Sequence, residues 1–417
     1  MSMAFGVPGK TPTTHEDWQR RVLDALDAFS PGAPIDEASL LAGRSSQIDR
    51  MIETVFQRGQ HAILYGERGV GKSSLANTFS AKVVGGARII TSVPVNCHPS
   101  DDFSRIWRNV FRRLSREGKP VSEYYPSEIY PDDVVVELSQ FSLNTIPIII
   151  LDEFDKLMDQ KARNLVANTI KDLSDRSVKA TIILVGVADS IGDLIDEHQS
   201  ISRCLHQIQM QRMMPSELKE IVSSRLGPLG MLIRGDALNH VVSLSRGLPH
   251  YTHLFGQQAA KKALEAKTLV IDLEHLDAAL PDCIERTDQM LRKNYHKAVS
   301  SPRRENIYTE VLLASALAPV DDLGYFAPAD LRTPLSELLL RDAPVSLYGQ
   351  HLKKLCENDR GNPLEITGTD RKFRYRFVEP MMQPFILMNG LKKGLITRKQ
   401  IEDLAANHYH SAIVGEL

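Results

Sequence analysis

The sequence lacks the features that mark secreted, membrane-spanning and repetitive proteins. Its four cysteines stand singly with no CxxC pair, which argues against a disulfide framework or a cysteine-based zinc site. No apolar run approaches the roughly 20 residues of a membrane-spanning helix, and the N-terminus has no apolar core of secretory length. No repeat of about 20–50 residues is present, which excludes solenoids and propellers. We therefore expect a cytoplasmic protein without a membrane partner.

An excess of charge of either sign is also missing. The 417 residues include 50 Lys and Arg against 52 Asp and Glu, a formal net charge of −2. Any contact with nucleic acid must therefore come from a local patch. The apolar content of 42% is sufficient for real hydrophobic cores, and the length indicates two or three domains.

Two kinds of hydrophobic pattern divide the chain. In residues 34–212, short apolar runs alternate with stretches of helical spacing, which predicts an α/β core with a parallel sheet. Residues 119–131, rich in proline and tyrosine, are predicted to form a surface loop. Residues 213–298 show only helical patterns and are predicted to form a small bundle. The apolar runs lie at residues 61–65, 88–96, 146–152 and 180–187.

Segments rich in proline, glycine or serine mark the other boundaries. Residues 1–33 form a predicted extension with one amphipathic helix, ending at Ser-Pro-Gly. Residues 303–390 are predicted to hold three helices and a β-hairpin, the elements of a winged helix. Ser346 is the predicted cap of the third helix. Residues 391–417 are a predicted C-terminal tail.

A glycine-rich segment follows the first apolar run. Residues 66–73 match GxxxxGK[ST], the phosphate-loop pattern. Glycines let backbone N–H groups surround phosphate oxygens, and the next helix directs its N-terminus at the same charge. Lys72 is predicted to neutralise the β- and γ-phosphates of ATP, and Ser73 to bind Mg²⁺. The predicted nucleotide contacts are Gly66, Glu67, Arg68, Gly69, Val70, Gly71, Lys72, Ser73 and Ser74.

Two carboxylates end the third apolar run. Asp152 and Glu153 follow Ile-Ile-Ile-Leu at the carboxyl end of a predicted parallel strand, where such sheets bind ligands. Asp152 is predicted to complete the Mg²⁺ shell, and Glu153 to orient and polarise the attacking water. Acidic residues after a strand can instead begin a helix, but the glycine loop upstream favours ATP hydrolysis.

Together with shorter motifs, these segments resemble the AAA+ ATPases, and in particular the initiator clade that includes origin-recognition ATPases. Residues 41–44, Leu-Ala-Gly-Arg, resemble the box that lines the adenine pocket, which implies that Arg44 lies there. Residues 95–97, Val-Asn-Cys, resemble the end of the family's second strand. In the family a polar residue at that position can restrain the catalytic glutamate, and Asn96 occupies it.

The resemblance also implies an active site shared between subunits. Residues 198–203 resemble the box that carries the arginine finger, which assigns that role to Arg203 and implies a homo-oligomer with the finger acting in trans. The resemblance covers residues 34–298, so that residues 213–298 become the helical lid of the ATPase. A winged helix follows the lid in that clade, as predicted here.

Two positions depart from the family pattern. Residues 183–189 resemble the sensor-1 strand, yet Asp189 stands where an amide or hydroxyl is usual, and Ser190 is the alternative. A carboxylate near a γ-phosphate is unfavourable unless a cation compensates for it. Residues 247–250, Gly-Leu-Pro-His, resemble the sensor-2 segment with His250 in place of an arginine. The sequence leaves both sensor roles open.

The predicted winged helix carries a cluster of basic residues. On the second strand of its hairpin, Arg374 and Arg376 share one face, and aromatic residues share the other. The basic face is predicted to point outward and bind duplex DNA. Against this, residues 303–376 contain 11 Lys and Arg and 11 Asp and Glu. The predicted DNA contacts are Lys353, Lys354, Arg371, Lys372 and Arg374.

These observations predict a Mg²⁺-ATP-dependent AAA+ ATPase that acts as an oligomeric switch on DNA or on a DNA-processing protein. The alternative is a signalling ATPase of the STAND type, which also joins a phosphate loop, a Gly-Leu-Pro motif and a winged helix. In that case the winged helix would dock a protein partner. A scaffold with a degenerate site is disfavoured, because Lys72, Ser73, Asp152 and Glu153 are all intact.

Overall fold

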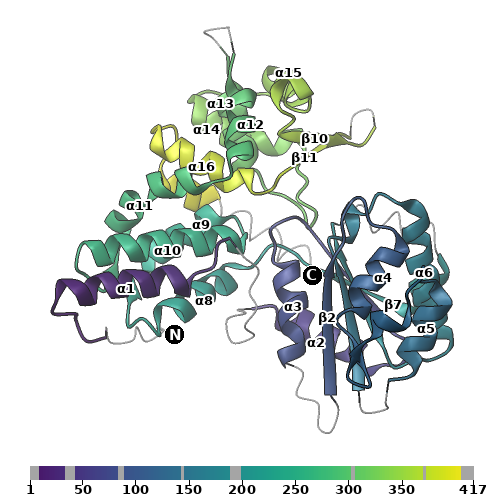
Figure 1. Ribbon diagram of the computed structural model, residues 1–417. Coiled ribbons are helices and arrows are strands. Elements are labelled where there is room, and N and C mark those ends of the chain that lie inside the picture. The colour runs from purple at the N-terminus through teal and green to yellow at the C-terminus, as the bar shows by residue number, and fades with distance from the viewer. Residues whose placement is uncertain are drawn as a thin grey trace. The chain divides into compact units, whose positions relative to one another are not determined.

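The computed structural model describes residues 9–32, 43–82, 89–141, 145–187, 199–301, 306–369 and 372–404. It divides into two compact units. The α/β unit comprises Pro34–Glu67 and Gly71–Gln211. The helical unit comprises Met1–Ala33, Arg68–Val70 and Arg212–Leu417. Both are drawn in Figure 1.

The α/β unit is built on a five-stranded parallel sheet with the strand order β2-β5-β6-β1-β7. Its central strands are almost continuous apolar runs, as expected for strands covered on both faces. Alternate side chains of β5 point to opposite faces, so that Ile149 and Leu151 join the core beneath the helices at Phe103–Phe111, Pro131–Ser139 and Gln160–Asp175. The strands are β1 (His61–Tyr65), β2 (Ile89–Asn96), β5 (Thr145–Asp152), β6 (Thr181–Gly186) and β7 (Leu205–Gln209).

Helices cover both faces of this sheet (Figure 1). On one face lie α2 (Ser45–Phe56) and α3 (Lys72–Lys82), and on the other lie α4 (Phe103–Phe111), α5 (Pro131–Ser139) and α6 (Gln160–Asp175). The three-layer α/β architecture expected from the alternating pattern is confirmed. The short elements are β3 (Ser115–Arg116), β4 (Lys119–Pro120), η2 (Val121–Tyr124), η3 (Phe154–Lys156) and η4 (Gln199–Cys204).

Two features of this unit differ from the sequence-based expectation. The strand β7 was not predicted, because only Leu205 and Ile208 are apolar and buried, and its other residues are one His and two Gln. The segment 119–131 is not a simple surface loop, since it begins with β4 and η2 and buries Val121 and Ile129 completely or nearly so. Those apolar side chains join the core under α4, and this fixes the segment against the unit.

The helical unit begins with α1 (His15–Ala28), which packs along α10 (Pro249–Glu265). Thr14 caps α1 by accepting the backbone N–H of Asp17. The Gln257 side chain donates to the backbone oxygens of Leu26 and Phe29, so that the N-terminal helix is tied to the bundle. The other bundle helices are α8 (Pro215–Leu226), α9 (Gly235–Ser245), α11 (Leu273–Arg286) and α12 (Gln289–Val299).

The sequence pattern predicts only helices for this bundle, but the bundle also contains strands. A short parallel pair, β8 (Leu232–Ile233) and β9 (Val270–Ile271), joins two of its loops. Two-residue strands are too short to produce a recognisable alternation, so the pattern missed them.

The C-terminal part of the helical unit contains three helices, a hairpin and a further helix. The hairpin strands β10 (Leu364–Thr367) and β11 (Arg374–Phe377) pair antiparallel, with Leu364 opposite Phe377. The prediction for Ser346 is wrong: Pro344 is the N-cap of the third helix, no side chain caps it, and Ser346 lies in its first turn. The helices are α13 (Tyr308–Leu317), α14 (Arg332–Leu339), α15 (Val345–Leu355) and α16 (Met382–Lys392), with η5 (Pro328–Leu331) and η6 (Asn358–Arg360) between them.

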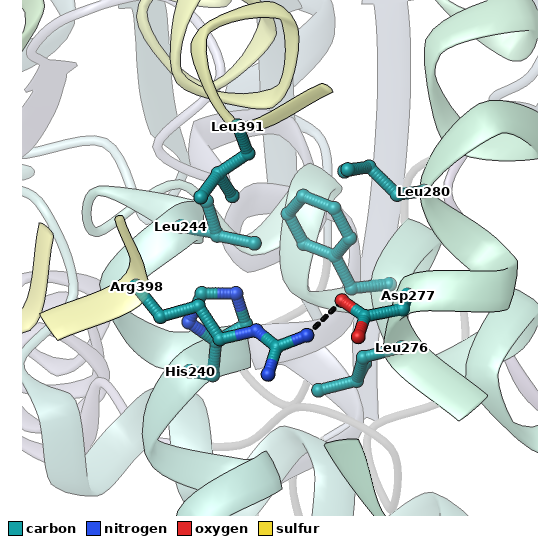
Figure 2. A pocket seen from close by; sticks show the side chains of 8 residues that line it. His240, Leu244, Leu276, Asp277, Leu280, Leu391 and Arg398 are labelled. Carbon is teal, nitrogen blue, oxygen red and sulfur yellow. Dashed lines mark ion pairs between the residues drawn. The ribbon is translucent and has the colours of Figure 1, made fainter. Parts of the chain in front are cut away.

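A cavity of about 160 Å³ lies inside this unit, lined by α9, α10, α11 and residues 391–398 (Figure 2). Arg398 forms an ion pair with Asp277 at its wall, and the cavity is also lined by Leu244, Leu276, Leu280 and Leu391. His240 is 2% exposed, and its Nδ1 lies 3.5 Å from Glu402 Oε1, too far for a strong hydrogen bond. Burial lowers the pKa of His240 to about 4.

None of the helices in the described ranges is both long and apolar enough to cross a membrane.

Candidate nucleotide-binding site

The glycine loop lies between β1 and α3, as the motif requires. The strand ends at Tyr65, and the helix begins at Lys72. Gly66 and Gly71 have φ of +154° and +95°. A Cβ on Gly66 would lie 2.2 Å from the backbone oxygen of Met210, so no larger residue fits there. The conformation of the loop therefore depends on its glycines, because the backbone of Met210, which follows β7, leaves no room for a side chain at Gly66.

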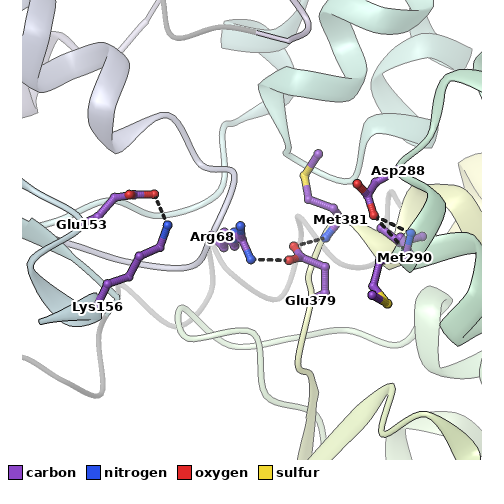
Figure 3. Close-up of polar contacts among 8 residues, drawn as sticks. Arg68, Glu153, Lys156, Asp288, Met290, Glu379 and Met381 are labelled. Atoms are coloured by element: carbon purple, nitrogen blue, oxygen red, sulfur yellow. Dashed lines mark hydrogen bonds and ion pairs between the residues drawn. The ribbon is translucent and has the colours of Figure 1, made fainter. Parts of the chain in front are cut away.

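Polar groups line the start of α3. The Lys72 ammonium donates to the backbone oxygens of Gly66 at 3.0 Å and Glu67 at 2.7 Å, so it lies over the loop. Ser73 and Ser74 are half-buried in the first turn of the helix. Arg68 and Gly69 fall in the helical unit with Val70, and there Arg68 pairs with Glu379 at 2.9 Å (Figure 3).

The two carboxylates occupy the carboxyl end of β5. Asp152 is the last strand residue and is 7% exposed, and its Oδ1 accepts the backbone N–H of Glu153 at 2.8 Å. β5 and β1 both pair with β6 in parallel, so their carboxyl ends share one edge of the sheet. The two ends of the glycine loop, at Glu67 and Gly71, and both carboxylates are therefore on the same edge of the α/β unit.

Glu153 has an unusual backbone and a cationic neighbour. Its φ and ψ of 55° and 33° place it in the left-handed region, and it begins the short helix η3. Lys156 Nζ lies 2.6 Å from its Oε1 (Figure 3). Sequence reasoning overlooked Lys156, although a spacing of three residues after a carboxylate was a visible signal.

Asn96 lies beside Asp152. The two residues are partners in the parallel register of β2 and β5, and the N–H of Cys97 donates to the Asp152 backbone oxygen at 2.8 Å. Asn96 is exposed at the end of its strand. This register brings Asn96 to the same edge as the two carboxylates, whereas the Glu153 carboxylate accepts a hydrogen bond from Lys156.

Arg44 lies in a different local environment from an ordinary surface arginine. It is 5% exposed, has a φ of 63° and precedes α2. Its guanidinium donates to the backbone oxygen of Gln211 at 2.6 Å, which ties the start of α2 to the segment after β7.

Arg203 is displayed at the surface of the α/β unit. It lies in η4 and is flanked by Ile201 and Cys204, which are 1% and 2% exposed and anchor this turn in the core. Its Nη2 lies 2.7 Å from Asp175 Oδ1 at the end of α6, and the two side chains are 69% and 46% exposed. A guanidinium has five N–H donors, so this ion pair leaves others for a further partner.

Three predicted site residues lie outside the described residues, and a fourth, His250, belongs to the helical unit. Asp189 and Ser190, the sensor-1 candidates, lie outside the described residues, as does Arg371 in the hairpin. His250 is in the first turn of α10, where burial lowers the pKa of its imidazole and a hydrogen bond to the backbone of Pro31 opposes that shift. A neutral ring at pH 7 cannot replace the charge of an arginine.

The basic face predicted for the hairpin is largely paired with carboxylates. Arg374 forms an ion pair with Asp321 at 2.8 Å, and Arg376 forms one with Glu365 across the hairpin. Lys354 pairs with Glu357 at 2.7 Å. Arg374 and Lys354 point outward as predicted, with side chains 47% and 50% exposed, whereas the Arg376 side chain is only 15% exposed. The DNA contacts stay a prediction, and composition did not reveal that these cations meet carboxylates. Tyr375 and Phe377 are buried as predicted.

Two cations of the predicted DNA surface remain without a carboxylate at ion-pair distance among the described residues. Lys353 lies over the ring of Phe373, with Nζ 5.2 Å from the ring centroid, and Lys372 is exposed.

Residues 55–195 match a family model described as an AAA domain. The match falls on the glycine loop, the two carboxylates and four of the five sheet strands. Residues 55–195 of the α/β unit therefore have the fold of an AAA domain, with its phosphate-loop motif.

Within that class, the chain resembles ORC1-type replication initiators. ORC1-type DNA replication protein 2 of Thermoplasma acidophilum is 26% identical over 191 residues, which are 44% of this chain and 46% of the relative. ORC1-type DNA replication protein 1 of Halobacterium salinarum is 33% identical over 104 residues, 25% of this chain and 32% of the relative. The chain thus spans about half and about a third of these relatives' lengths.

Two solved structures have the same fold over most of the chain. The Aeropyrum pernix ORC2 protein, in ADPNP–ADP complexes, has a TM-score of 0.52 at 15% identity and covers 93% of this chain and 98% of its own. A Walker-type ATPase of Pyrococcus abyssi has a TM-score of 0.52 at 16% identity, covering 85% and 99%. At such identities, the likeness establishes the fold.

Proposed function

We propose that the protein binds and hydrolyses Mg²⁺-ATP. The observation that carries the proposal is the common sheet edge that holds the glycine loop, Asp152 and Glu153. Backbone N–H groups of the loop and the Lys72 ammonium would bind the phosphates, and Arg44 would border the base. The AAA domain match supports this chemistry.

The donor set also suits magnesium. The Ser73 hydroxyl and the Asp152 carboxylate are hard oxygen ligands, and Mg²⁺ is commonly held by one or two such groups together with phosphate oxygens and water. When bound, the metal neutralises charge that develops on the phosphates. In this chain, Glu153 would take a proton from the attacking water.

We further propose that the ATPase is an oligomeric switch with Arg203 as a finger acting in trans. The exposed position of Arg203 on an anchored turn supports this role, because a finger must project toward a neighbouring subunit. The curated relatives are named DNA replication proteins, which supports DNA or a DNA-processing protein as the partner. Residues 303–390 would serve as a winged helix in this contact.

The STAND-type alternative is retained for one specific reason. The paired arginines of the hairpin leave a surface with little free positive charge, which suits a protein-docking winged helix. That alternative shares the ATP site and differs only in the partner.

The test of the ATPase proposal is nucleotide binding and turnover by three proteins. Lys72→Ala should weaken ATP binding by about a hundredfold or more, because it removes the main cation from the phosphates. Glu153→Gln should bind ATP like wild type and lose turnover, because an amide cannot accept the proton. Binding of a fluorescent ATP analogue and release of phosphate measure the two effects. Wild-type turnover by Glu153→Gln would refute the assignment.

A further inference from the structure

A cation lies beside the candidate general base. Lys156 Nζ is 2.6 Å from Glu153 Oε1, and the two residues are also joined through the backbone, where Lys156 N–H donates to Glu153 O at 2.9 Å (Figure 3). Lys156 ends the one-turn helix η3 that follows β5, and Glu153 is the N-cap of that helix. The three-residue spacing and the tight turn bring the ammonium and the carboxylate close together.

The turn that presents Lys156 is fixed from both sides. Asp155 Oδ1 accepts the backbone N–H of Val187, at the end of β6, at 3.3 Å. Arg163 in α6 donates to the backbone oxygens of Asp155 at 3.0 Å and Leu157 at 2.7 Å. Leu157 is fully buried. The residues on each side of Lys156 are therefore tied to neighbouring elements, and only its side chain is left to move.

The Glu153 carboxylate itself has few such restraints. Its side chain is 39% exposed and begins from a left-handed backbone conformation, which is unfavourable for a non-glycine residue. Exposed ion pairs of this kind contribute little to folding, because solvent screens the two charges. The pair with Lys156 therefore does little for stability, but it selects one orientation of a carboxylate that could otherwise rotate.

We propose that Lys156 is a positioning residue for Glu153 in ATP hydrolysis. The ammonium holds Oε1, which leaves Oε2 to accept the proton of the attacking water. As the water oxygen bonds to the γ-phosphorus, the bond from that phosphorus to the bridging oxygen breaks, and ADP departs. Glu153 then passes the proton to solvent. The inference rests on the proposed ATPase function and adds a residue that does not itself touch ATP.

The test compares Lys156→Met, which keeps the aliphatic stem, with Lys156→Arg, which keeps the charge. Misplacing a reacting group can cost up to about a hundredfold in rate, so we expect Lys156→Met to lower kcat about tenfold, with KM and the affinity for a fluorescent ATP analogue unchanged. Lys156→Arg should restore most of the rate. Lys161→Met, at an exposed lysine in the first turn of α6, is the matched control and should behave like wild type.

A double-mutant cycle separates positioning from a general structural defect. In a Glu153→Asp background the shorter carboxylate no longer reaches Lys156, so adding Lys156→Met should have little further effect. Equal fold losses in both backgrounds, or a loss by Lys156→Met no greater than that of Lys161→Met, would overturn the inference. If wild type does not hydrolyse ATP, or Glu153→Gln turns over normally, it is the proposed function that fails.

Discussion

The charged side chains of the two units are arranged differently. In the α/β unit, Lys72, Asp152 and Glu153 gather at one edge of an apolar sheet, and Arg203 projects from an anchored turn. In the helical unit, hairpin arginines are neutralised by carboxylates of the same unit. There, His240 is also held neutral by burial. The α/β unit thus places charged side chains at a sheet edge and on an exposed turn. In the helical unit, the hairpin arginines pair with carboxylates of the same unit.

This difference explains which predictions the sequence could support. The glycine loop specifies backbone geometry through fixed spacing, so its chemistry follows from the residues themselves. A basic patch has no such spacing rule. Whether Arg374 is available depends on Asp321, a residue remote in sequence that reaches it only in the folded chain.

The largest expected effect is a loss of ATP hydrolysis when Arg203 of the α/β unit is changed. Arg203→Ala should retain nucleotide binding and lose about 10³-fold in hydrolysis, because an arginine finger stabilises charge only in the transition state. Turnover of the variant and its affinity for an ATP analogue, measured above the concentration at which subunits associate, check this.

Mixing provides the matching control for that prediction. Lys72→Ala subunits lack a working phosphate site but retain the finger, so adding them to Arg203→Ala subunits should partly restore hydrolysis. A strictly monomeric enzyme at working concentration, or no restoration in mixtures that do associate, would contradict a finger in trans.

The α/β core and its site edge could be predicted because long apolar strands and the two phosphate-site motifs are local signals. β7 was missed because three of its five residues are polar, so that it gives no apolar run that would indicate a strand. The proline-rich segment 119–131 was misjudged because Val121 and Ile129 are buried by partners distant in sequence. Lys156 could have been found, whereas Asp175 beside Arg203 could not, because only tertiary packing joins α6 to η4.

The next effect concerns His240 and stability. Burial lowers its pKa to about 4, against about 6.5 in an unfolded chain, so between these values the unfolded state binds a proton that the folded state does not. The free energy of unfolding should therefore fall as the pH drops through this window, by about 2 kcal/mol at pH 5 from this residue. Arg398, Asp277 and Glu402 face the ring and complete its charged surroundings.

His240→Phe should remove that contribution. Urea unfolding at pH 7.5 and pH 5 should show a loss of stability about 2 kcal/mol smaller in the variant than in wild type. The same substitution at the exposed His296 of α12 is the control and should leave the difference between the two pH values unchanged. An unaltered pH dependence in His240→Phe would mean that burial does not hold this histidine neutral.

The smallest effect tests whether the hairpin's own carboxylates conceal a DNA surface. Changing Asp321→Asn together with Glu365→Gln removes the carboxylates that pair with Arg374 and Arg376, and should tighten binding to duplex DNA about tenfold at low salt, with a steeper salt dependence. Changing Lys353 and Lys372 together to alanine should weaken it by a similar factor. Asp342→Asn, which frees Arg332 in α14 instead, is a matched control and should change the affinity less.

Fluorescence anisotropy of labelled duplex with the ATP-bound protein, at two salt concentrations, measures all four proteins. Absence of binding at low salt in wild type and in the carboxylate variant would favour a protein partner, because the hairpin charges would then serve folding and docking rather than phosphate contact.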